Sequence, residues 1–352
     1  MKKIALLSIC TAAFLSAALA GCSDKKSSSA EVEDKPVERV SPKRIAFEWQ
    51  EPYKAKIDEF RSSADFSQED SRFDIRDLDR NGTPELIISP ASDPNSACQL
   101  YTFSEGEVIS LGENGSFGCF VYYPENCCFN SEHYGQGFIL GEYRTLSENG
   151  FKTELSYYNN ADSASSGAAI TYEIDKEDVT LKQYDEEISK FAGYPSVLLG
   201  RKYTFGNACE EQALYFTESW RAVLSEKEKE LIRNKLTELA PDYDGYAGFE
   251  LCDLDNDDCP ELIFSEGISD GCGCRIFCLN EGELTELEGK YGNSGKIGFD
   301  AEKYVFFSVD SSGNQCWNLT DEPLDNYEKS DSIIECGRNY LLSDAVINYA
   351  LQ

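Results

Sequence analysis

The chain has 352 residues and a strong excess of acidic side chains: 64 aspartates and glutamates against 32 lysines and arginines, for a formal net charge of −32. Such a charge makes nucleic acid and anionic lipid surfaces poor partners, and it leaves cations, cationic peptides and neutral glycans as candidates. The length, with 20 Tyr and 20 Phe residues for packing, is sufficient for two globular domains.

Residues 1–21 are predicted to be a signal peptide. Lys2 and Lys3 precede an apolar run, Ile4–Leu19, which is too short for a comfortable membrane span. The run ends in Leu-Ala-Gly-Cys, which resembles the lipobox of bacterial lipoproteins. The resemblance implies cleavage before Cys22 and a diacylglycerol on its sulfur, hence a protein of the bacterial cell envelope that is anchored by lipid and faces outside the cytoplasm. The alternative is an ordinary secretory signal peptide with a chance cysteine.

Residues 22–44 are predicted to be a tether. They combine a lysine–serine run, several acids and two prolines with almost no apolar side chains. Such a segment cannot bury enough surface to fold, so we expect a flexible acidic and serine-rich linker that spans roughly 26 Å r.m.s..

The most informative feature is a segment that occurs twice, 176 residues apart. Residues 73–88 read FDIRDLDRNGTPELII, and residues 249–264 read FELCDLDNDDCPELIF. After each copy, two alternating apolar runs around Glu-Gly predict a β-hairpin. Before each copy a helix is predicted: residues 47–61, with apolar residues at helical spacing, and residues 225–239, which begin with a Ser-x-x-Glu capping box.

Beyond the hairpins the two halves diverge. The first half predicts strands at 119–123, 137–146, 151–159 and 169–174 and a short helix at 181–191; the second predicts strands near 297, at 304–309 and at 315–319, and a closing helix at 342–351. We therefore predict an α+β protein of two tandem repeated domains, 45–200 and 201–352, each with an N-terminal helix packed on an antiparallel β-sheet or meander.

Each copy places oxygen-bearing residues at alternate positions of a tight turn between two apolar runs. Because the backbone wraps around the ion, alternate residues face it, and hard oxygen ligands suit Ca²⁺. Gly82 at the sixth position permits a left-handed turn, whereas Asp258 there makes the second site geometrically less favourable. The predicted ligands of the two Ca²⁺ sites are the side chains of Asp77, Asp79, Asn81 and Glu85 with the carbonyl of Thr83, and the side chains of Asp253, Asp255, Asp257 and Glu261 with the carbonyl of Cys259.

The loop is not an EF-hand, because the twelfth position is Ile88 or Phe264 where an EF-hand has Glu. The pattern Asp-x-Asp-x-Asn-Gly-x-Pro-Glu-Leu resembles the calcium loops of FG-GAP and VCBS repeats. That resemblance implies that the last acid binds the ion and that a strand follows directly; two copies do not imply a propeller. The layout also resembles a broad group of clostridial surface lipoproteins, which implies no activity. The alternative is a polar turn held by side-chain hydrogen bonds without an ion.

The cysteines predict disulfides. Of 14 cysteines, Cys10 lies in the signal peptide and Cys22 is the predicted anchor, which leaves an even number for an exported fold. A thiolate metal site in the segment 272–278, and free thiols, are the alternatives. Comparison of the copies favours two pairs whose members appear together in the second copy: Cys252 with Cys259, and Cys272 with Cys278.

No motif identifies a catalytic site. His133 is the only histidine and lies in a turn-like sequence, and no Gly-x-Ser-x-Gly is present. We therefore predict a binding or scaffold module with an extracellular glycan or protein ligand. The alternatives are an envelope hydrolase that cleaves glycans through paired acids, and a purely structural envelope protein. A set of strand aromatics could stack sugars, although packing is the favoured interpretation: Phe120, Tyr122, Tyr123, Tyr143, Tyr157 and Tyr158.

Overall fold

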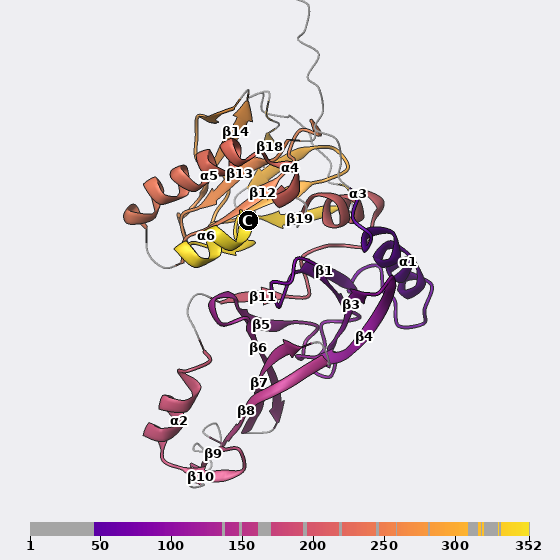
Figure 1. The fold of residues 1–352 in the computed structure, drawn as a ribbon, viewed down its shortest axis with the longest axis vertical. Helices are drawn as coiled ribbons and strands as arrows, with labels where there is room; N and C mark the ends of the chain where they lie inside the picture. Colours follow the sequence, from indigo (N-terminus) through magenta and orange to yellow (C-terminus); the bar gives the residue numbers. More distant parts are fainter. Residues whose placement is uncertain are drawn as a thin grey trace, which may run out of the picture. The chain divides into compact units, whose positions relative to one another are not determined.

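The structure of the protein is a computed structural model. It describes residues 46–351 except 136–137, 148–149, 161–169, 193–195, 218–219, 244–245, 258, 281, 309–315, 318, 320–329 and 331. The predicted signal peptide, Cys22, the tether and Asp258 lie outside the described residues. From Ser41 to Gln352 the chain forms one compact unit, a mixed α+β fold with antiparallel sheets and few helices (Figure 1). Within the described ranges no helix has the length and apolar character that a membrane crossing requires.

The first half begins with a helix on a four-stranded sheet. Helix α1 (Gln50–Arg61) buries Tyr53, Ile57 and Phe60, whose helical spacing confirms the predicted helix. Its sheet has the order β1-β2-β3-β4, and β3 and β4 form the predicted hairpin. The strands are β1 (Arg72–Arg76), β2 (Glu85–Ser89), β3 (Cys98–Ser104) and β4 (Glu107–Asn114).

A seven-stranded sheet follows, in the order β10-β9-β8-β7-β6-β5-β11. Strands β5, β7, β8 and β9 and helix α2 match predicted elements, whereas β6, β10 and β11 are additional. Helix α2 begins with a capping box between Thr180 and Gln183. The elements are β5 (Phe120–Tyr123), η1 (Pro124–Asn126), β6 (Cys128–Gly135), β7 (Phe138–Ser147), β8 (Gly150–Asn159), β9 (Tyr172–Ile174), β10 (Glu177–Val179), α2 (Leu181–Ile188) and β11 (Val197–Leu199).

The second half has helices and two smaller sheets, ordered β15-β14-β13-β12-β20 and β18-β17-β16-β19. Helix α5 (Glu226–Leu239) starts at the predicted capping box, where the Ser225 hydroxyl accepts the N–H of Glu228 and the Glu228 carboxylate accepts the N–H of Ser225. The other elements are α4 (Trp220–Val223), η4 (Ala240–Asp242), β12 (Gly248–Cys252), β13 (Glu261–Ser265), β14 (Cys274–Asn280), β15 (Glu283–Glu286), β16 (Ile297–Asp300), β17 (Val305–Ser308), β18 (Cys316–Trp317), β19 (Ile333–Cys336), β20 (Tyr340–Leu341) and α6 (Asp344–Ala350).

Alternate residues of the inner strands pack on opposite faces of each sheet. In β2, Leu86 and Ile88 join the core beneath α1, while Ile87 packs toward the seven-stranded sheet. In β13, Phe264 packs beneath α5 and α6, which lie over this sheet in Figure 1, while Ile263 packs toward the β16–β19 sheet. Each half therefore has one helix layer and two sheet layers, which explains why β2 and β13 are buried along their whole length.

The first half extends beyond the predicted boundary at residue 200. The main chains of Tyr203 and Phe73 exchange two hydrogen bonds, of 3.0 and 2.9 Å, at the free edge of β1. Helix α3 (Asn207–Glu211) and the π-helical segment η3 (Gln212–Thr217) follow, and Ala213 and Leu214 belong to the core beneath α1. Residues 203–217 thus complete the first sheet and its helix layer.

The two halves share a continuous core and buried polar contacts. Side chains of both halves lie in one hydrophobic cluster, and η3 contacts both β1 and β12. Arg76 donates to Asn339 Oδ1 at 3.1 Å, and Lys202 forms a buried ion pair with Glu250. These contacts explain why the halves form a single compact unit.

Candidate metal centres

Both predicted metal loops connect two paired strands that fix their ends. The first loop runs from Asp77, directly after β1, to Glu85, the first residue of β2, and Arg76 pairs with Glu85 in the register. The second runs from Asp253 to Glu261 between β12 and β13, which pair in the equivalent register. The predicted strand after each loop is confirmed.

Side-chain oxygens hold the backbone of the first loop. The Asp77 carboxylate accepts the N–H groups of Asn81, at 3.1 Å, and Gly82, at 3.0 Å. Asp79 Oδ1 accepts the same Asn81 N–H at 3.1 Å, and Asn81 Oδ1 accepts the N–H of Thr83 at 2.7 Å. Glu85 Oε2 closes the loop by accepting the N–H of Leu78 at 2.9 Å.

The second loop has four of these five hydrogen bonds at equivalent positions; the equivalent of the Gly82 N–H would belong to Asp258, which lies outside the described residues. The Asp257 N–H donates to Oδ1 of both Asp253 and Asp255 at 3.2 Å. Asp257 Oδ1 accepts the N–H of Cys259 at 2.8 Å, and Glu261 Oε2 accepts the N–H of Leu254 at 2.8 Å. The predicted alternation of oxygen-bearing side chains therefore produces one geometry twice.

The backbone turns through positive φ at the fourth position of both loops. Arg80 has φ 60° and Asn256 has φ 62°, and Gly82 adds a positive φ of 90° at the sixth position of the first loop. The fourth-position turn is not evident from the sequence, because only Asn256 is a residue type that favours this region.

Three carboxylates converge in each loop. Oxygens of Asp77, Asp79 and Glu85 lie within 4.8 Å of one another, and those of Asp253, Asp255 and Glu261 do the same. Asp257 lies outside the second group. These two triads are the clusters of three or more acidic, cysteine or histidine ligands in the described part of the chain, so the cysteines at 272–278 do not assemble a thiolate site there.

Burial raises the pKa of the glutamate in each triad. Desolvation raises the pKa of Glu85 well above its ordinary value, the N–H of Leu78 opposes this, and the charges of Asp79 and Asp77 add to it. Burial raises the pKa of Glu261 in the same way, and the neighbouring aspartates of its loop contribute. A cation among the three carboxylates would reverse this effect, and the all-oxygen donor set fits a hard cation.

Residues outside the loops also position the first site. Tyr53 of α1 donates to the carbonyl of Pro84 at 2.7 Å, Tyr122 of β5 donates to the carbonyl of Leu78 at 3.1 Å, and Thr102 of β3 donates to Glu85 Oε1 at 3.0 Å. The loop is thus held against the helix and both sheets. The sequence carries no local signal for these contacts, because each joins residues far apart in the chain.

The described cysteines are free thiols, so neither predicted pair is joined in this structure. Cys252 lies against Cys336, and this contact, together with burial, raises the pKa of the Cys252 thiol. Cys259 instead has its sulfur 3.5 Å from the Leu279 carbonyl. Cys278 is on β14, while Cys272 precedes that strand.

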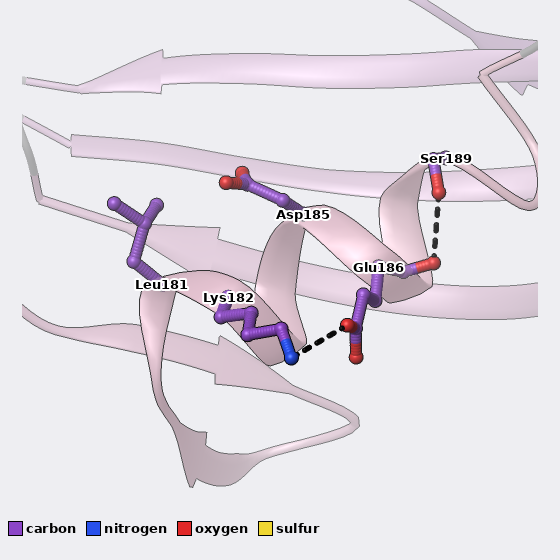
Figure 2. Close-up of a pocket in the computed structure, with 5 residues that line it drawn as sticks. All are labelled: Leu181, Lys182, Asp185, Glu186 and Ser189. Atoms are coloured by element: carbon purple, nitrogen blue, oxygen red, sulfur yellow. Dashed lines mark hydrogen bonds and ion pairs between the residues drawn. The ribbon is translucent and has the colours of Figure 1, made fainter.

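The other candidate features do not converge on a site. His133 is exposed on β6. Tyr143 packs on Tyr157 with ring centroids 5.4 Å apart and both are buried, as the packing interpretation of the strand aromatics requires. A hollow of about 520 Å³ lies along one face of α2. Figure 2 shows the residues that line it, among them Lys182 and Glu186, whose ion pair has an N–O distance of 3.4 Å. A single helix supplies all its lining residues, so this hollow has one wall and is not a functional candidate.

Comparison of the chain with protein-family models, curated proteins and solved structures found no match.

Proposed function

We propose that the protein is a calcium-binding lipoprotein of the bacterial cell envelope that acts as a binding or scaffold module. The observation that carries this proposal is the pair of carboxylate triads, which have the same hydrogen-bond pattern in two loops of different sequence. A turn that needed only internal hydrogen bonds would not require three carboxylates within 4.8 Å of one another, because they repel each other in the absence of a cation.

Calcium is the favoured ion because of the ligand type. The triads offer carboxylate oxygens, and the loops add amide and main-chain oxygens to complete a coordination shell of six to eight. Thiolate and imidazole ligands, which favour zinc and copper, are not part of either triad. In this role the ion would join the end of one strand to the start of the next and stabilise the sheet.

We further propose that the two halves are copies of one unit, with boundaries near 46–217 and 220–351. A second internal match supports this: Gly-Arg-Lys-Tyr at 200–203 and Gly-Arg-Asn-Tyr at 337–340. Tyr203 pairs with Phe73 just as Tyr340 pairs with Phe249. The differing offsets, 176 and 137 residues, are explained by the larger second sheet of the first half.

The two glycines of this match occupy equivalent surroundings. A Cβ on Gly200 would lie 2.6 Å from Cys98 Sγ, and a Cβ on Gly337 would lie 3.0 Å from Cys274 Sγ. The N–H of Gly200 donates to Asp74 at 3.2 Å, and that of Gly337 donates to Glu250 at 2.9 Å. Only glycine fits such close approaches, which supports a common origin for the two segments.

The anchor is a separate part of the proposal and rests on the sequence around Cys22. It is tested by feeding cells an alkyne-labelled fatty acid and comparing the chain with its Cys22→Ala variant. Label that persists in the variant would contradict lipidation at this cysteine.

The central experiment is a calorimetric titration of Ca²⁺ into chelator-stripped protein that starts at Ser23. We expect two sites per chain in the natural sequence and one in each of the variants Asp79→Asn and Asp255→Asn. Equal concentrations of Mg²⁺ should give less heat, because that ion requires stricter geometry and dehydrates reluctantly. Absence of heat with Ca²⁺ would indicate that both loops are polar turns that bind no ion.

A further inference from the structure

Two sheet edges line one cavity. Strand β11 ends the seven-stranded sheet, strand β19 ends the sheet of β16–β18, and residues of both line a cavity of about 780 Å³. This volume is typical of a ligand site. An edge strand has one row of main-chain N–H and C=O groups that is not used by its own sheet, so it can pair with an added strand.

The cavity has more cations than acids in a chain that is otherwise strongly acidic. Among the described residues that line it, five side chains are basic and three are acidic, whereas the whole chain has twice as many acids as bases. The basic residues are Arg72, Arg201, Lys202, Lys296 and Arg338, and the acidic residues are Asp74, Glu250 and Glu335.

Two of the cations are paired within the cavity and two others lie close together. Lys202 pairs with Glu250, and Lys296 pairs with Glu335. Burial and the nearby charge of Arg201 lower the pKa of Arg72, which donates to the main-chain carbonyl of Ser71 at 2.7 Å. Arg201 forms an ion pair with Asp70 at 3.1 Å and also donates to Ser89. With Asp70 counted, the five basic side chains face four acidic ones among the described residues, so the cavity wall keeps a small excess of positive charge.

An aliphatic surface lies beside these charges. Leu198, in the middle of β11, is 64% exposed, while Val197 and Leu199 on either side are buried. The remaining apolar lining residues are Val121 and Ile333. The lining residues that the structure describes include no aromatic side chain on which a sugar ring could stack.

We propose that this cavity binds an extended acidic peptide, which adds to the edge strand β11 and places a carboxylate against Arg72. Guanidinium groups bind carboxylates through paired hydrogen bonds, and alternate side chains of an added strand would meet Leu198 on one face. The three residues of β11 span about 10 Å and can pair with about three residues of an added strand, so a peptide of roughly five residues covers the edge with one residue to spare at each end. The proposal specifies the ligand of the binding module proposed above and does not depend on calcium.

The chain's overall negative charge limits the range of this attraction. At physiological ionic strength charges are screened beyond about 8 Å, so an acidic peptide would sense the cavity rather than the distant surface. The cations must therefore act at contact, and changes of charge on the cavity wall should alter affinity directly.

The test uses fluorescence anisotropy of a dye-labelled Glu-Val-Glu-Val-Glu peptide with the tethered chain that starts at Ser23. Leu198→Asp should weaken binding at least about tenfold and Leu198→Lys should preserve or strengthen it, because one adds a like charge and the other an opposite charge. Arg72→Gln should also weaken binding. Leu181→Asp makes the same change at another leucine, 51% exposed on α2, and should have no effect.

Matched peptides and competitors decide the ligand class. Peptides with Lys or Gln in place of Glu should not bind. Equal binding of the three peptides, or an unchanged affinity in Leu198→Asp, would overturn the proposal. Oligogalacturonate and inorganic phosphate are titrated as competitors. If either one binds at concentrations at which the peptide does not, the proposal is overturned in favour of a glycan or a small anion. Each sample is also titrated with Ca²⁺, so a failure of peptide binding with two intact calcium sites would leave the proposed calcium function standing.

Discussion

Asp79→Asn should stabilise the protein in the absence of calcium and lose most of that advantage when calcium is present. Asp79 is half-buried, and its carboxylate lies within 4.8 Å of those of Asp77 and Glu85. Asparagine keeps Oδ1, so the hydrogen bond from the Asn81 N–H is preserved. The change therefore removes a charge without removing the turn.

The magnitude follows from the distances. Two unit charges 4.8 Å apart repel by about 0.9 kcal/mol in bulk water and by about 3.5 kcal/mol at an effective dielectric constant of 20. Since Asp79 is partly exposed, the lower figure applies, and two such neighbours give a gain of about 1–2 kcal/mol for the variant in chelator. In calcium at 100 times the dissociation constant, the natural loop gains about 2.7 kcal/mol; a variant that binds tenfold more weakly loses about 1.4 kcal/mol of this.

The assay is urea unfolding at pH 7, followed by tryptophan fluorescence, in excess chelator and in millimolar Ca²⁺. The variant should be the more stable protein in chelator, and calcium should stabilise it less than it stabilises the natural chain. Asp65→Asn, an exposed acid after α1, controls for the change in net charge and should shift neither curve. If Asp79→Asn loses the same stability in both buffers, the aspartate is only a turn residue and the argument from repulsion fails.

Three other predictions follow from buried or constrained residues. Burial raises the pKa of Asp74 to about 6, so the folded state binds this proton more tightly than the unfolded state does. The resulting stability is present at low pH and is lost as the pH rises from about 4 to about 6. Asp74→Asn should remove up to about 3 kcal/mol of this pH dependence, and an equal slope of unfolding free energy against pH for both proteins between pH 4 and 7 would contradict this. Gly82→Ala should destabilise the protein by about 1–2 kcal/mol in thermal unfolding, because φ is 90° at this position. A Cβ there would meet no other atom within 4 Å, so the cost comes from the backbone conformation alone. An unchanged melting temperature would show that the loop can adopt another conformation at no cost. Mild oxidation should join Cys252 to Cys336, since these thiols are in contact, and a mass-mapped Cys252–Cys259 peptide would refute this.

The sequence predicts those parts of the fold that depend on local chemistry. The capping box at Ser225, the helical spacing in α1 and the alternation in the β3–β4 hairpin each specify their element within a few residues. The internal geometry of the loops is equally local, because the hydrogen bonds within each loop join residues at most seven positions apart. This is why the arrangement of both carboxylate triads could be expected before the fold was known.

The parts that depend on distant contacts could not be predicted. Strand β11 has only three residues, and all three are aliphatic although Leu198 is exposed. The sequence therefore lacks the alternation of apolar and polar residues that predicts a strand. Tyr203 joins the first sheet by pairing with a residue 130 positions away, which no local pattern reveals. The repeated Gly-Arg-x-Tyr was the available signal for this boundary, at an offset different from that of the loops.

The buried contacts between the halves have a consequence for how duplicated chains diverge. In a symmetric pair of identical units, any contact across the axis must occur twice with the same residues. Here Arg76 and Cys252 hold matching positions, as do Lys202 and Asn339, yet Arg76 meets Asn339 and Lys202 lies near Cys252. Under the proposed duplication, joining the two copies in one chain allows such positions to become complementary partners. The buried Arg76–Asn339 hydrogen bond then has no identical counterpart elsewhere among the described residues, so an isolated half would lose this partner of the Arg76 guanidinium.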